Sequence, residues 1–316
     1  MNDSFADDEE AQKGTETKIP NPDMISLSEI SYFTDGIKQG VRGDGRTSDA
    51  MRPLKLELGV VPTANGSCRV QSKACDIYVA IKCAIGRPSP VAPEEGVFSV
   101  AVEFGCSVLP RLQDFSGRQA TIEAETLSEI VANHISSMCL SSLNKKQFCI
   151  EPRKVCWLVS IDVLVERVDG PLIDPISIGV RGALMDLELP HVTLTPDSEK
   201  DGDSKEPLVP LVDLSESMWR MLPHDASAVC VSIGVYSDNS IIIVDLDRIE
   251  ENLAKLKQNC LLTVSVNDAG ECCGIHKFGS GSIDALVTRD VVSAGLILGQ
   301  RISKTLTTLS RQKLKH

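Results

Sequence analysis

The chain has 316 residues, of which 42% are hydrophobic and 24% charged, a composition typical of one large or two small globular domains. No apolar run approaches the roughly 18 residues of a transmembrane helix, and the acidic start MNDSFADDEEAQ argues against a signal or transit peptide. The formal net charge of −12 disfavours nucleic acid as a partner, but residues 1–23 and Thr195–Pro207 carry most of it and leave −4 for the rest. A local basic surface on the body is therefore still compatible with this sequence.

Eleven cysteines are scattered through the chain without a CxxC pair or a disulfide framework. Cys83, Cys156 and Cys230 lie inside apolar runs, where a free thiol behaves as a small hydrophobic side chain. The sequence therefore predicts reduced, buried thiols in an intracellular protein.

The first part of the chain predicts a tail followed by strands and helices. The polar, acidic residues 1–24 are expected to be disordered. Ser26 and Glu29 have capping-box spacing and predict a helix over 26–41. Hydrophobic periodicity predicts strands over 54–61, 76–85 and 97–106, and a helix over 121–143.

The run 157–167 is apolar enough to predict a strand covered on both faces. Asp174 and Pro175 are residue types preferred at the N-cap and at the first helical position, and they predict a helix over 174–187. The acidic stretch 195–210, most charged over Thr195–Pro207, is typical of a loop or linker.

A second α/β stretch follows this acidic loop. The pattern predicts strands over 228–236, 240–246, 261–266 and 272–277, and helices over 247–258 and 283–315. The segment Ser237-Asp238-Asn239 is a hairpin signal between the first two strands. We therefore predict an α+β fold of layered α/β type, with one half over 25–194, another over 211–316 and a long C-terminal helix.

Several patterns suggest a site but also have a structural explanation. Cys272, Cys273 and His276 invite a metal site, yet no second ligand pair is visible and the run alternates like a hairpin strand. The glycines of FGSGS (278–282) lack the spacing and the lysine of a phosphate loop, which favours a flexible connection into the last helix. The five histidines are dispersed, and no nucleophile elbow such as GxSxG occurs.

Two pairs of arginines are candidates for contact with RNA phosphates. Arg42 and Arg46 bracket a turn at Asp44, where either Asp44 pairs with a neighbouring arginine or the arginines meet a phosphate backbone or a partner subunit. Arg111 and Arg118 flank a glycine-containing loop, where they either bind phosphates through their guanidinium groups or are solvated.

The ordered motifs of the chain resemble those of the RNase PH family. The resemblance is carried by GVRGDGR (40–46), SGRQATIEAETLSEIVANHI (116–135), VERVDGPLIDPISIGVRGALMDLELPHV (165–192) and the segment from IIVDLDRIEEN to GSGSID (242–284), and spans about 26–312. It is similar to the form found in eukaryotic RNA exosome ring subunits. The resemblance implies a fold of two βαβ-type halves. It also implies a hetero-hexameric ring of RNase PH-like subunits around RNA, with cap subunits as further partners and no contact with a membrane. The implied location is the nucleus, the nucleolus and the cytoplasm.

The resemblance also implies where chemistry would occur. Active members hold inorganic phosphate with Gly-Thr-Arg or Gly-Ser-Arg after an Asp-Gly turn, where this chain has Gly170-Pro171-Leu172-Ile173. They also hold a metal ion with an acidic pair. Asp245, Asp247, Glu250 and Glu251 keep the first part of that pattern, whereas no acid occurs near Lys257-Gln258-Asn259.

A third departure from the family is Lys73-Ala74-Cys75-Asp76, where many members have Gly-x-Thr. The expectation is thus a non-catalytic exosome ring subunit with no catalytic residue, cofactor or metal, supporting 3′–5′ RNA processing and degradation. A phosphate-dependent 3′-exoribonuclease and an unrelated α/β interaction protein are the alternatives.

Overall fold

The structure is a computed structural model in which residues 27–105, 108, 118–196, 208–213, 219–220, 227–236, 241–256 and 259–313 are described. The predicted acidic tail lies outside these residues. Within the described part, no helix is both long enough and apolar enough to cross a bilayer.

The first half is built on a sheet of order β1-β2-β3-β6-β4, with β5 beside β6. Its strands are β1 (Lys55–Leu58), β2 (Gly66–Gln71), β3 (Asp76–Gly86), β4 (Val97–Phe104), β5 (Cys149–Glu151) and β6 (Val155–Arg167). Only β4 and β6 pair in parallel among these strands. Along β6, buried residues such as Ile161 alternate with more exposed ones such as Asp162. The prediction that both faces of this strand are covered is therefore wrong, because one face reaches solvent.

The second half contains an antiparallel sheet of order β12-β11-β13-β14. Its strands are β11 (Val229–Tyr236), β12 (Ile241–Val244), β13 (Cys260–Val266) and β14 (Cys272–Phe278). Strands β11 and β13 are buried along their whole length. Their mostly apolar sequences follow from this position, since both faces of the sheet centre are covered by helices.

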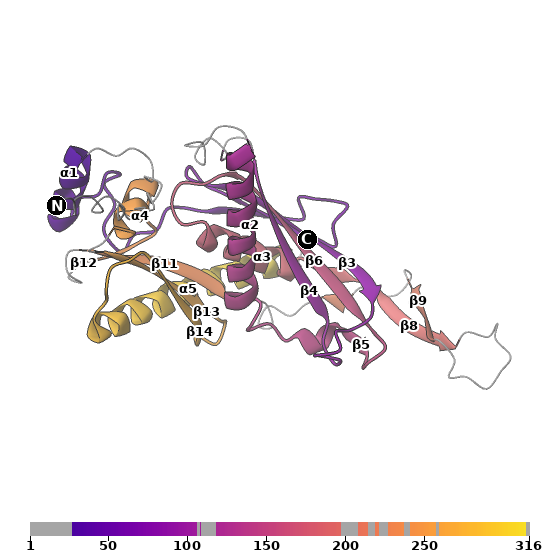
Figure 1. Cartoon of the computed structure of the whole chain (residues 1–316). Helices are drawn as coiled ribbons and strands as arrows, with labels where there is room; N and C mark the ends of the chain where they lie inside the picture. Colours follow the sequence, from indigo (N-terminus) through magenta and orange to yellow (C-terminus); the bar gives the residue numbers. More distant parts are fainter. Residues whose placement is uncertain are drawn as a thin grey trace, which may run out of the picture.

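Helix α3 (Ile173–Met185) lies between the two sheets and packs on β1, β2 and β3 on one side and on β11 on the other. Helix α2 (Arg118–Met138) packs on β4 and beside α3, while α5 (Ala285–Lys313) packs on β11 and β13. Figure 1 shows the resulting layers of sheet, helices, sheet and helix. Helices α1 (Leu27–Lys38) and α4 (Arg248–Ala254) lie together at one end of the molecule.

Short elements complete the described chain. A 3₁₀ turn covers Lys145–Phe148, and β7 (Glu188–Leu189) pairs with β10 (Trp219–Arg220). Strands β8 (His191–Pro196) and β9 (Leu208–Asp213) form a hairpin that projects from the body in Figure 1. These two strands occupy both ends of the stretch predicted as an acidic loop, and residues 197–207 lie outside the described part.

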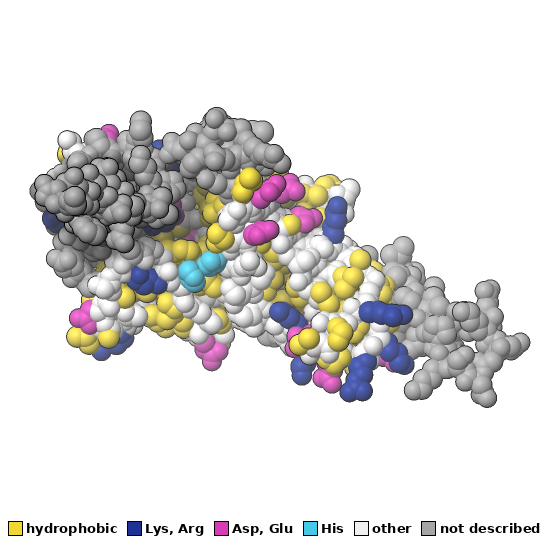
Figure 2. Space-filling model, in the orientation of Figure 1, with side chains coloured by type: hydrophobic (Ala, Val, Ile, Leu, Met, Phe, Trp, Pro, Cys, Tyr) yellow, Lys and Arg dark blue, Asp and Glu magenta, His cyan; other side chains and the backbone are white. Residues whose placement is uncertain are grey.

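The predicted fold class is confirmed by these layers and by the long C-terminal helix. The charge of the chain is unevenly spread, as the sequence allowed. Figure 2 shows lysine and arginine side chains gathered at the end of the molecule that carries β5, where Lys146, Arg153 and Lys154 are exposed.

Candidate functional site

The turn Asp169–Ile173 joins β6 to α3 and faces the second half of the chain. Gly170 has φ +107°, and a Cβ atom at this position would lie 2.1 Å from the backbone oxygen of Leu246. Both facts require glycine here. After it, Leu172 stands at the N-cap of α3 without a side-chain capping bond, and Ile173 is buried. The turn therefore presents proline, leucine and isoleucine at the helix start, where an anion site needs donors and a cation.

Asp174 is not the helix N-cap, so that prediction is wrong. It lies in the first turn of α3, and its carboxylate accepts hydrogen bonds from Ser232 N (2.7 Å) and Ser232 Oγ (2.6 Å) on β11. Ser232 Oγ also lies 2.8 Å from Thr263 Oγ1 on β13. Burial raises the pKa of Asp174 to about 7, with the two bonds from Ser232 opposing the rise and the charges of Asp245 and Glu251 adding to it. Asp174 thus ties α3 to the second sheet.

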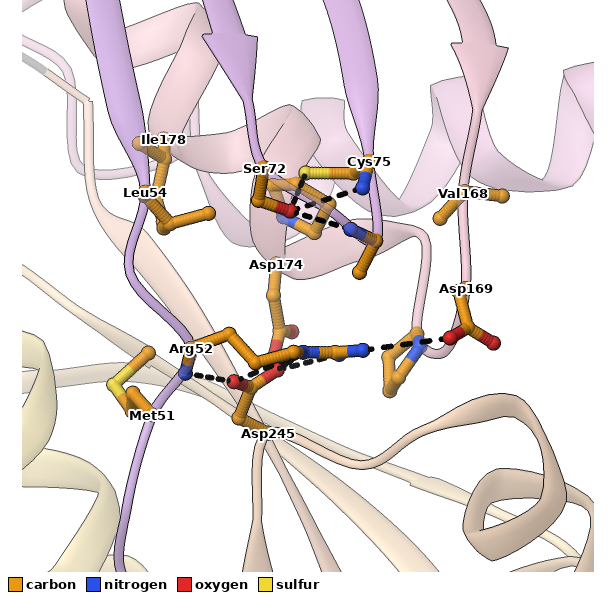
Figure 3. A pocket seen from close by; sticks show the side chains of 13 residues that line it. Met51, Arg52, Leu54, Ser72, Cys75, Val168, Asp169, Asp174, Ile178 and Asp245 are labelled. Atoms are coloured by element: carbon orange, nitrogen blue, oxygen red, sulfur yellow. Dashed lines mark hydrogen bonds and ion pairs between the residues drawn. The ribbon is translucent and has the colours of Figure 1, made fainter. Parts of the chain in front are cut away.

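A small pocket of about 40 Å³ lies on one side of the turn (Figure 3). Arg52 is the cation in its wall. Its Nη2 lies 2.6 Å from Asp245 Oδ1 and donates to the Leu246 carbonyl at 2.8 Å, while its Nη1 lies 3.7 Å from Asp169 Oδ2. Asp174 lines the same pocket. Two carboxylates therefore face the guanidinium group of Arg52, and Asp174 adds a third carboxyl group to the wall, so the pocket disfavours a phosphate.

Sequence reasoning missed Arg52. It stands 193 positions from Asp245, and no motif joins the two residues. Only the fold brings them together, because the segment before β1 crosses the end of the second sheet (Figure 3).

A second pocket of about 100 Å³ lies on the other side of the turn. Its walls are mostly apolar and include Leu127, Ile130, Val131, Pro171, Leu172, Ile173, Leu261 and Phe278. Its cation, Lys255, is held by Glu251 at 2.7 Å. The hydroxyl groups of Ser232 and Thr263, which also line it, are bonded to each other. Burying a phosphate against these walls would remove its hydration with little compensation.

The four acidic residues of the segment 245–251 are all engaged in bonds within the chain. Asp245, with φ +48°, is bound by the guanidinium groups of Arg46 and Arg52. Asp247 forms a capping box with Glu250 at the start of α4, and Glu251 pairs with Lys255. Among the described residues, no group of three or more His, Cys, Asp or Glu side chains is arranged to hold a metal ion.

Arg42 is buried, with 4% of its surface exposed, and forms a two-bond ion pair with Glu250 at 2.8 Å and 2.7 Å. Arg46 donates to Asp44, Asp245 and the Ala50 carbonyl. The pairing of Asp44 with a neighbouring arginine, one of the two alternatives in the sequence, is thus confirmed. The donors of Arg42 and Arg46 are used within the chain, which weighs against their predicted RNA contact, and that contact stays a prediction.

The remaining candidates have mixed outcomes. Arg111 lies outside the described residues, and of Arg118 only its place at the start of α2 is described, so their predicted RNA contact stays a prediction. Cys272, Cys273 and His276 lie on β14, which confirms the hairpin strand. Gly279 and Gly281 lie in the connection from β14 to α5, as predicted for FGSGS.

The two halves match the two domains of one protein family. Residues 50–190 match domain 1 of the 3′ exoribonuclease family, RNase PH, and residues 226–301 match its domain 2. The chain belongs to the RNase PH family. The turn with the two pockets lies at the junction of these two domains, since its residues come from the first match and Asp245 and Lys255 from the second.

Relatives named as exosome components align with almost the whole chain. The protein is 29% identical over 295 residues to "Exosome complex component Rrp42" of Methanocella arvoryzae, which covers 93% of this chain and 98% of that protein. It is 27% identical over 285 residues to the protein of the same name from Methanopyrus kandleri, covering 90% and 97%.

Solved structures share the fold at lower identity. A chain of the structure "archaeoglobus fulgidus exosome with RNA bound to the active site" matches with a TM-score of 0.62 and 18% identity, over 87% of this chain and 96% of that one. A chain of "Archaeal exosome core" matches with a TM-score of 0.61 and 19% identity, over 88% and 95%. These two matches confirm the fold of the chain.

Proposed function

We propose that this RNase PH-family chain is a non-catalytic core subunit of the RNA exosome ring. In this role it supports 3′–5′ processing and degradation of RNA, including ribosomal RNA maturation and messenger RNA turnover, through ring assembly and contacts along the RNA path. The observation that carries the proposal is the turn Gly170–Ile173, where the family's anion site would lie and where the chain presents apolar groups between two ion-paired cations.

The magnitude of the missing stabilisation supports a non-catalytic role. Pro171 has no N–H group to donate. A helix N-terminus contributes only about 0.3–1 kcal/mol to an exposed anion, whereas enzymatic acceleration requires roughly 8 kcal/mol or more. Stabilising the transition state of phosphate attack would require a cation or a metal ion at this turn. Arg52 and Lys255 would each have to leave a carboxylate partner to provide it.

Ring membership is supported by the relatives, because proteins named as exosome components align over nine-tenths of the chain. The outer strands of both sheets, β1, β4, β12 and β14, give the chain edges that neighbouring subunits of the same fold can cover. We propose hetero-hexameric assembly with other RNase PH-like subunits, capped by further subunits, in the nucleus, nucleolus and cytoplasm.

The native mass of the chain with its copurifying proteins tests this assembly. Isolated at low salt from its own cells, the chain is expected in a complex several times its own 34.2 kDa mass that contains related subunits. A chain that runs only as a monomer under these conditions would contradict the proposal.

RNA contact is proposed for Arg111 and Arg118, which precede and begin α2. Contacts with phosphates are independent of sequence and weaken with salt. Replacing both residues with glutamate in the reconstituted ring is expected to weaken RNA binding. Unchanged crosslinking and unchanged affinity across a salt series would remove them from the RNA path.

A further inference from the structure

An open groove of about 530 Å³ lies beside the first pocket, at the end of the first sheet where β2 turns into β3. It is lined by Pro53, Leu54, Lys55, Gln71, Ser72, Lys73 and Arg167. Leu54 and Ser72 also line the pocket in Figure 3, so groove and pocket adjoin. Every ionisable residue in this lining is a cation, although the whole chain carries a net charge of −12.

Lys73 is held at the tip of a rigid turn. The Ser72 hydroxyl accepts hydrogen bonds from the backbone N–H groups of Ala74 and Cys75, each at 3.0 Å, and the Ser72 N–H donates to the Cys75 carbonyl at 2.8 Å. The Lys73 side chain is exposed, and within the described residues no carboxylate forms an ion pair with it. The turn therefore fixes where this ammonium group is presented.

Arg167 stands beside this turn at the end of β6. One of its Nη atoms donates to the Ser72 carbonyl at 3.0 Å, which orients the guanidinium group. Its Nε and its other Nη atom have no acceptor among the described residues. These two donors point to different edges of the guanidinium plane, so each is available to a phosphate oxygen.

Nearby carboxylates neutralise only part of the charge of the groove, and one of them, Asp76, lies opposite Arg167 in the sheet. Asp76 is held by two bonds from Arg69, at 2.9 Å and 2.8 Å, and Glu57 lies 2.6 Å from Lys55 Nζ. Lys55 is thus the weaker member of the set, because its charge is already paired at the surface. The basic end near β5 is different, since Lys146 and Lys154 are paired there with Glu94 and Glu151.

We propose that Lys73 and Arg167, assisted by Lys55, bind the phosphodiester backbone of single-stranded RNA in this groove. The inference rests on the proposed function and adds an RNA contact in the first half that the sequence did not predict. An acidic protein segment is the less favoured occupant. Protein interfaces need a buried apolar centre, and none of the exposed large hydrophobic residues among those described lines the groove.

The experiment uses the ring reconstituted with Lys73→Glu/Arg167→Glu and a fluorescent uridine homopolymer as probe. Its matched control is Lys146→Glu/Arg153→Glu, which changes the same residue types and the same net charge at the β5 end. The groove variant is expected to bind about tenfold more weakly or worse. The slope of its log affinity against log salt concentration should become shallower by roughly 1.4, the value for two phosphate contacts on a single strand. The control should keep the affinity and slope of the unmodified ring.

Three results would overturn the assignment. Equal affinity and slope in the groove variant would show that the groove does not meet RNA, and equal losses in both variants would show only an effect of net charge. Loss of a copurifying subunit with RNA binding intact would show a protein interface. If the charge-reversed chain does not assemble into a ring, the milder Lys73→Gln/Arg167→Gln variant keeps the test valid. Failure of the unmodified chain to join a ring would instead contradict the proposed function.

Discussion

The buried ion pair between Arg42 and Glu250 gives the sharpest prediction of stability. It joins the segment before β1 to α4, and its two side chains are only 2% and 5% exposed. Besides the two bonds to the carboxylate, the guanidinium donates to the carbonyl groups of Thr47, Val244 and Asp245 at 3.2, 3.2 and 2.9 Å. Replacing Arg42 with methionine leaves a buried carboxylate and these carbonyls without their partner. The expected loss is about 3–5 kcal/mol in the free energy of unfolding.

A double-mutant cycle isolates this pair. Glu250→Met also removes the capping-box bond to Asp247 N at 2.9 Å, so it carries a separate cost of about 1 kcal/mol. The Arg42→Met/Glu250→Met protein should lose much less free energy of unfolding than the two single variants lose together, because no buried charge is left without a partner. Urea unfolding followed by circular dichroism measures all four proteins. Lys38→Met is the control, since its ion pair to Asp35 is exposed at 3.7 Å and should change stability by less than about 0.5 kcal/mol. A loss below about 1 kcal/mol for Arg42→Met, or purely additive losses in the cycle, would refute the structural role of Arg42.

Further predictions concern the turn and its surroundings. Asp174 has a pKa of about 7 in the folded chain against 3.8 in a model compound, so the folded state loses stability as pH rises through this window. The stability of Asp174→Asn should therefore rise relative to that of the parent protein between pH 5 and pH 8, by at most about 3 kcal/mol, and an equal stability difference at both pH values would contradict the assignment. Gly170→Ala should destabilise the chain by several kcal/mol, on the order of 3 or more, because its Cβ would meet Leu246 O at 2.1 Å; a melting temperature within a degree of the parent would refute this. Pro171→Thr with Leu172→Arg should create no phosphorolysis, since the carboxylates nearby stay bound to arginine and lysine; measurable release of nucleoside diphosphate by this variant would show that the turn alone limits the chemistry.

Local patterns predicted most elements because periodicity and end signals depend on neighbours in the sequence. Asp247 illustrates this: it was predicted to start a helix, and it caps α4 with Glu250 in a capping box. By contrast, β2 was not predicted, although it is buried along most of its length. Its sequence, Gly66–Gln71, contains glycine, serine, cysteine and arginine, and only pairing with β1 and β3 makes it a strand.

The candidate site shows where sequence reasoning ends. The sequence predicts the turn itself and its lack of groups that could donate to a phosphate. Asp174 was assigned to the cap because Asp-Pro is a strong local signal, but Ser232, 58 positions away, takes its carboxylate instead. The ion pairs of Arg42 and Arg52 escape sequence reasoning for the same reason, since their acidic partners lie 208 and 193 positions away. Long-range ion pairs produce no periodic pattern in the sequence. The fold alone determines whether a charged side chain faces solvent or a partner of opposite charge.

Phosphate-dependent shortening of RNA by the purified chain tests the central claim most directly. The chain, alone and in its native ring, is incubated with single-stranded RNA and inorganic phosphate, and nucleoside diphosphate release is measured with contaminating nuclease excluded. We predict no release from the chain alone, and no change in any activity of the ring when Leu172 is replaced by alanine. Nucleoside diphosphate released by the unmodified chain alone would contradict a non-catalytic role.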